Sequence, residues 1–106
     1  MTKYLIQGTY TADGAKGLLA GGGSTRRQIV GDLVAQLGGS MEAFYFAFGE
    51  SDVFAIVDVP DAATMTAIAL TVGGSGAVAI ETTVLITPEE VDAASGIAVN
   101  YTPPGG

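Results

Sequence analysis

The sequence predicts an α+β domain in which two strand–helix–strand units follow each other and form one four-stranded antiparallel sheet, with the helices on one face. Two observations support this fold class. The stretch from Phe44 to Asp61 predicts a hairpin of two apolar strands, with a turn at Gly49–Asp52 and an end at Pro60. A strand and a helix are predicted before this hairpin, and a helix and a strand after it. The resulting order, βαββαβ, is that of the ferredoxin-like fold.

The first strand and the first helical region precede the hairpin. Residues 4–10 alternate around two tyrosines, which predicts a strand. A helical region then begins near Thr11, pauses at Gly21–Gly23 and resumes at Ser24, where Ser24 or Thr25 is the expected N-cap. The apolar residues of the resumed helix have the spacing of one helix face, and two glycines at positions 38 and 39 end it. These apolar residues are Ile29, Val30, Leu33, Val34 and Leu37.

The proline and aspartate that end the hairpin also open the next helix. Asp61 is the expected N-cap, and residues 62–72 carry apolar side chains on one side of a helix. Those side chains are Met65, Ile68, Ala69 and Val72. Glycines between residues 73 and 76 end this helix, and residues 77–86 predict the fourth strand.

The C-terminal segment begins with a strong local helix signal. Thr87–Glu90 form a capping box with proline at the first helical position, which predicts a short third helix through Ala94. Residues 1–96 are therefore predicted to form one domain. Residues 97–106 contain two consecutive prolines and end in two glycines, so we expect an extended or flexible tail.

The residue types that the chain lacks exclude several kinds of chemistry. Its 106 residues include no cysteine and no histidine, which excludes disulfides, thiol nucleophiles and the usual ligands of zinc and haem iron. We therefore expect no cofactor and no transition metal. No apolar run approaches the roughly 18 residues that cross a bilayer, and the N-terminus leads into a strand without the pattern of a signal peptide. A cytoplasmic location is expected.

The charge of the chain limits its partners. The net charge is −7, with four lysines and arginines against eleven aspartates and glutamates. Nucleic acids and anionic membranes bind basic surfaces, which four cations cannot form, so neither is expected as a partner. The simplest interpretation of the acidity is solubility.

Several segments resemble the GYD domain family over nearly the full chain. They are KYLIQGTYTADGAKGLL at the start, GGSTRR at residues 22–27, FAFGESDVFAIVDVPD in the hairpin and TTVLITPEEVDAA near the end. The family takes its name from a Gly-Tyr-Asp neighbourhood at the hairpin turn, where Gly49 and Asp52 match and Ser51 stands in place of tyrosine. The resemblance implies a dimeric α/β barrel, in which two ferredoxin-like subunits pack sheet to sheet. It implies no activity, and Ser51 removes any role of the tyrosine ring.

The strand pattern favours the same pairing independently. In a βαββαβ unit both helices cover one face of the sheet and leave the other face bare. The second and third strands carry apolar residues toward both faces, so the bare face needs a cover. Closed two-fold pairing with a second copy is the commonest arrangement, and we expect a homodimer or a higher homo-oligomer. The apolar residues of these strands are Phe44, Tyr45, Phe46, Phe48, Val53, Phe54, Ile56 and Val57.

The space between two paired sheets is the first candidate site. Strand alternation places polar and apolar groups together on the sheet face away from the helices, which is typical of a small-molecule pocket. The candidates for ligand binding are Gln7, Thr9, Phe54, Ile56 and Thr83. Burial suits a carboxyl group to act as a general base, and the candidates for catalysis are Glu81, Asp58 and Tyr45. The alternative is that the neutral residues form cross-strand bonds and the two carboxylates lie at solvated rims.

The glycine-rich turn before the resumed helix is the second candidate site. Its free backbone N–H groups and two arginines can bind a phosphate or a carboxylate. The residues concerned are Ser24, Thr25, Arg26 and Arg27. The segment lacks the spacing of a P-loop and of a dinucleotide fingerprint. The alternative is a break in the helix whose arginines pair with carboxylates of the same or the partner subunit.

Three classes of function stay open from the sequence. The first is a protein that forms sheet-to-sheet oligomers and binds a small molecule between the sheets. The second is an assembly protein whose interior is filled by side chains. The third is a cofactor-free enzyme, of oxygenase or isomerase type, which acts on a small organic substrate in the barrel and which fold analogy alone favours. A cavity on the order of 300 Å³ separates the first and third classes from the second.

Overall fold

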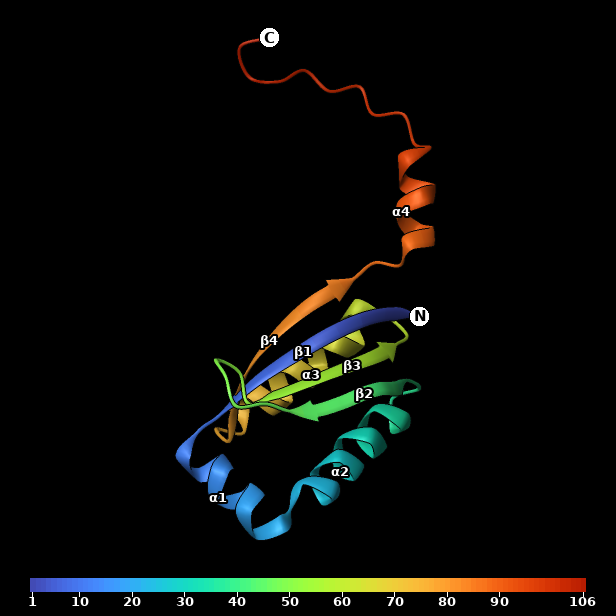
Figure 1. Ribbon diagram of the computed structural model, residues 1–106. Coiled ribbons are helices and arrows are strands. Elements are labelled where there is room, and N and C mark those ends of the chain that lie inside the picture. The colour runs from blue at the N-terminus through green and yellow to red at the C-terminus, as the bar shows by residue number, and fades with distance from the viewer.

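The computed structural model describes residues 1–106, and it confirms the α+β ferredoxin-like fold. The chain forms four strands and four helices (Figure 1). Their order and bounds are β1 Thr2–Tyr10, α1 Ala12–Gly21, α2 Gly23–Gln36, β2 Ser40–Phe46, β3 Val53–Val59, α3 Ala62–Gly74, β4 Val78–Leu85 and α4 Pro88–Ser95.

The four strands form one sheet in the order β2-β3-β1-β4, and all neighbouring strands are antiparallel. Helix α2 packs against the edge strand β2, and α3 packs against the other edge strand, β4. Both helices lie on the same side of the sheet (Figure 1). The opposite face of the sheet is therefore left uncovered within a single chain.

The core lies between the sheet and the two helices. Residues of β3 alternate between buried and half-buried, with Val53, Ala55, Val57 and Val59 buried toward the helices. One cluster is formed where β1 begins and β3 ends. It contains Tyr4, Val34, Val57, Val59, Met65 and Ile68. Only ten of the 106 residues are buried, eight of them apolar residues of the core, so most of the remaining apolar residues stay accessible.

The helical region after β1 is divided at Gly22. The hydroxyl of Thr11 accepts a hydrogen bond from the Gly14 N–H and caps α1. Gly22 has a φ of 86°, in the left-handed region that favours glycine, and α2 begins at the next residue. The prediction of Ser24 or Thr25 as the N-cap is therefore wrong: both residues already belong to α2, and the cap position at Gly22 has no side chain to offer.

The caps of α3 and α4 follow the sequence prediction. The Asp61 carboxylate accepts hydrogen bonds from the N–H and the hydroxyl of Thr64. In α4, Thr87 and Glu90 form the complete reciprocal capping box, with Pro88 in the first turn. Both signals are local, since each joins residues only three positions apart.

An irregularity in β2 changes which of its residues face the helices. The pairing register of β2 with β3 shifts between Met41 and Ala43, so that Glu42 is the extra residue of a bulge. Beyond this point Phe44 and Phe46 lie on the helix side, where their rings form an edge-to-face pair with centroids 5.3 Å apart. Tyr45 is thereby placed on the uncovered face.

The C-terminal arm, residues 86–106, projects from the body of the molecule (Figure 1). Its only regular element is α4, and residues 97–106 contain no helix or strand. The radius of gyration is 17.1 Å, against about 13 Å for a compact chain of this length. The arm exposes the apolar residues Ile86, Val91, Ile97, Val99 and Tyr101. None of the four helices has the length and apolar character needed to cross a bilayer.

Candidate functional site

The uncovered face of the sheet, here called the bare face, brings the predicted inter-sheet residues together. Each member of a row across the sheet is the register partner of the next. One row runs Tyr45, Phe54, Gln7 and Glu81, and the adjacent row runs Ala43, Ile56, Leu5 and Thr83. Thr9 and Asp58 lie on the same face in the flanking rows. The prediction that these residues share one face of the sheet is therefore confirmed. Ligand binding by them stays a prediction.

An ion-pair cluster occupies one end of the bare face. The Lys3 ammonium donates to the Asp58 carboxylate at 2.9 Å and also to the Glu42 carboxylate. The hydrogen bond to Glu42, followed by that to Asp58, raises the pKa of Lys3 above its ordinary value. Asp58 is thus already engaged by a cation. Among the carboxylates of this face, only that of Glu81 has no such partner.

The other polar groups of the bare face are free. Lys3 provides the side-chain hydrogen bonds on this face, so the polar atoms of Gln7, Thr9 and Thr83 have no side-chain partner within the chain. Cross-strand bonds between these residues, the alternative to a ligand site, are not formed in the single chain. The face is also open, since Tyr45 is 71% exposed.

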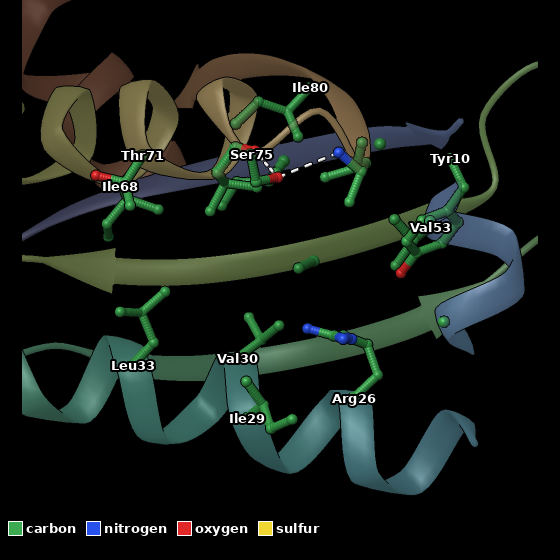
Figure 2. Close-up of a pocket in the computed structure, with 18 of the residues that line it drawn as sticks. Tyr10, Arg26, Ile29, Val30, Leu33, Val53, Ile68, Thr71, Ser75 and Ile80 are labelled. Carbon is green, nitrogen blue, oxygen red and sulfur yellow. Dashed lines mark hydrogen bonds between the residues drawn. The ribbon is translucent and has the colours of Figure 1, made fainter. Parts of the chain in front are cut away.

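A cavity of about 390 Å³ lies on the helix side of the sheet, between α2 and α3 (Figure 2). Val30 and Leu33 of α2 form one wall, and Ile68 and Val72 of α3 form the other. Strands β1, β3 and β4 form the floor. Fourteen of its 21 lining residues are hydrophobic, so the interior is predominantly apolar.

The polar groups of this cavity come mainly from the end of β1 and the start of the two N-terminal helices. They include the phenol of Tyr10, the carboxylate of Asp13 and the guanidinium of Arg26. Figure 2 shows the Arg26 side chain rising from α2 toward the space between the helices. Burial raises the pKa of the Tyr10 phenol, and the nearby Arg26 partly opposes that rise. The phenol therefore stays protonated at neutral pH and can donate a hydrogen bond.

The structure separates the four residues of the predicted anion site. Arg26 is half-buried and lines the cavity, whereas Ser24, Thr25 and Arg27 are exposed and do not line it. The two salt bridges of the chain both belong to Lys3, so neither arginine pairs with a carboxylate of its own chain. Only Arg26 of the four therefore belongs to this cavity, and an anion site formed by all four stays a prediction.

Asp52 has a structural role at the hairpin. Its carboxylate accepts a hydrogen bond from the Tyr10 N–H at 2.9 Å, and its own N–H donates to the Gly8 carbonyl. These bonds attach the hairpin loop to the end of β1. They also hold Tyr10 at the rim of the cavity.

Sequence reasoning missed the helix-side cavity and its residue Tyr10. The alternation of β1 does place Ile6, Gly8 and Tyr10 on the helix side. This alternation fits a filled core as well as a cavity. The distance between α2 and α3 decides between the two, and it cannot be read from the sequence of any one segment. No three carboxylates lie close enough together to hold a metal ion, and the expectation of a metal-free protein stays a prediction.

Comparison with known proteins adds one match. A family model, that of the GYD domain, matches residues 4–95 of the 106-residue chain. The match runs from β1 to α4 and leaves out the last eleven residues. No curated protein and no solved structure matches the chain.

Proposed function

The chain belongs to the GYD domain family, a family of unknown function, and from this premise we propose that it is a homo-oligomeric protein that pairs through the bare face and holds a small molecule between the sheets. The observation that carries this proposal is the apolar centre of that face. Leu5, Phe54 and Ile56 lie next to one another on the two central strands, and no helix of the same chain covers them. A second copy in two-fold pairing is the simplest cover.

Polar groups beside this apolar centre support the binding of a small molecule. Gln7 and Glu81 lie in the row of Phe54, and Thr83 lies in the row of Ile56. Their side chains have no partner within the chain, and a few oriented polar groups in an apolar space are typical of a ligand site. The ion pair between Asp58 and Lys3 favours binding over the enzyme alternative, since it engages one of the two carboxylates proposed for catalysis. A cytoplasmic location belongs to the same proposal.

Native mass spectrometry of the protein purified from its host tests both parts at once. We expect twice the subunit mass of 10.6 kDa, or a higher multiple, together with additional mass that denaturation releases. Ile56→Glu should give the monomer, because a carboxylate would be buried without a partner at the centre of the interface.

Leu70→Glu is the matched control, because Leu70 is 71% exposed on α3, away from the bare face. This variant should keep the oligomer of the wild type. A wild-type monomer at micromolar concentration, or an Ile56→Glu variant with the wild-type mass, would contradict the pairing. An oligomer without releasable mass would leave the pairing standing and remove the ligand.

A further inference from the structure

The helix-side cavity lies between α2 and α3, next to the closed end of the core. At the end where β1 begins, Val34 of α2 and Met65 of α3 are both buried in the core cluster. At the other end the lining combines small residues, among them Gly8, Ala55 and Ala77, with larger apolar ones such as Ile6 and Ile80. A space of about 390 Å³ is left, which lies in the range of small-molecule sites.

A single cation distinguishes this cavity from an unfilled core. The guanidinium of Arg26 lies at the wall, half-buried, and forms no salt bridge with the nearby Asp13 or with any other carboxylate. A guanidinium presents planar N–H donors that match a carboxylate in bidentate geometry. The phenol of Tyr10 lines the same space and supplies one more donor. An anionic group is therefore the natural partner at this wall.

We propose that this cavity binds a small organic acid with an apolar body, whose carboxylate pairs with Arg26 and whose body lies against the apolar walls of α2 and α3. A single negative charge fits better than two, because the cavity offers one cation and also contains the carboxylate of Asp13. A compact inorganic anion would leave the apolar walls uncovered. The site lies within one subunit, so it is separate from the space between the sheets.

Titration calorimetry with octanoate and with 2-naphthoate tests the proposal, since one probe is linear and the other is flat. We expect at least one of them to bind, with 2-naphthamide as the neutral counterpart of the aromatic acid. Arg26→Gln should weaken the binding of the acid tenfold or more and leave the binding of the amide nearly unchanged, since only the acid uses the charge. Arg27→Gln makes the same change in net charge at an exposed neighbour and should leave both affinities as in the wild type.

A second variant tests the position of the site by steric means. Gly17 lines the cavity, and a Cβ placed there meets nothing within 4 Å. Gly17→Leu should therefore fold and extend a side chain into the cavity, with loss of both acid and amide binding. Ile56→Glu should bind the acids as the wild type does, which keeps this test independent of the pairing through the bare face.

Three results would overturn the proposal. One is the absence of binding by both acids at millimolar concentration. Another is an equal effect of Arg26→Gln and Arg27→Gln, which would indicate a nonspecific charge effect. The third is binding of inorganic phosphate in preference to the organic acids, which would assign Arg26 to a different class of ligand.

Discussion

At the scale of single residues, two glycines of the same helix meet opposite surroundings. A Cβ at Gly14 would lie 1.9 Å from the carbonyl oxygen of Ala77, whereas a Cβ at Gly17 would meet nothing within 4 Å. Gly14 therefore allows α1 to approach the segment before β4 closely. No such close approach requires a glycine at position 17. Glycine there lowers the stability of α1, because its helix propensity is lower than that of alanine.

The same substitution at these two positions should have opposite effects. Gly14→Ala should lower the free energy of unfolding by about 2–3 kcal/mol, because backbone must move to relieve the clash. Gly17→Ala should raise it by about 1 kcal/mol, because alanine is the better helix former. Urea denaturation at one protein concentration measures both. Equal effects of the two changes would show that α1 does not pack as described.

At the scale of elements, the N-cap of α3 makes stability depend on pH in the acid range. Hydrogen bonds from the hydroxyl and then the N–H of Thr64 lower the pKa of Asp61 below its ordinary value of 3.8. A group whose pKa falls on folding stabilises the folded state above its unfolded pKa. That contribution is lost as the pH falls through the folded value.

Replacement of Asp61 tests this element directly. Asp61→Ala should lower the Tm by roughly 5 °C at neutral pH, as is typical for a lost N-cap in a domain of this size. The difference from the wild type should shrink as the pH falls below about 4, where the unfolded chain takes up a proton at Asp61 before the folded protein does. Asp61→Asn keeps a capping oxygen and should retain most of the stability without this pH dependence. Calorimetric scans from pH 2 to pH 7 provide the comparison.

The elements also show what the sequence can predict. The caps at Asp61 and Thr87 were predicted because they depend on residues three positions apart. The predicted cap of α2 was wrong because Gly22 turns the chain two residues before Ser24, the first polar candidate. The bulge at Glu42 has no signature in the apolar pattern. It arises when two strands pair, and it decides which aromatic residues of β2 face the helices.

The two candidate sites also differ in how far the sequence predicts them. Strand alternation predicted which of the named candidates share the bare face, but not the ion pairs of Lys3 with Asp58 and Glu42. The helix-side cavity was not predicted, because its volume depends on how α2 and α3 pack over the sheet. Arg26 was predicted as an anion-binding residue for a different reason, because a glycine-rich turn precedes it. The structure places it in the cavity and leaves Arg27 outside.

At the scale of the whole molecule, the body and the C-terminal arm are separate parts. The arm accounts for the elongated shape, with principal extents of 58 × 33 × 23 Å, and residues 97–106 are all exposed. The sheet, the helices α1 to α3 and both candidate sites lie in residues 1–85. We therefore expect the stability of the body to be independent of the end of the chain.

Deletion of residues 97–106 tests this independence. The Tm should stay within about 2 °C of the wild type, because no regular structure and no core residue is removed. Calorimetry at several protein concentrations is the measurement. A larger fall in Tm would show that the arm packs against the body or against a second copy, and a fall that grows on dilution would indicate the second copy.

The projection of the arm also determines where proteases cleave the protein first. Backbone that lies away from a packed body is cleaved first, and Tyr101 is an exposed aromatic residue in such a segment. The arm contains neither lysine nor arginine, so proteases that cut after aromatic or aliphatic residues reach it and trypsin does not. A chain trimmed there would still contain the whole sheet and the cavity. Trimming would thus change the outline of the molecule and its apolar surface while leaving both candidate sites intact.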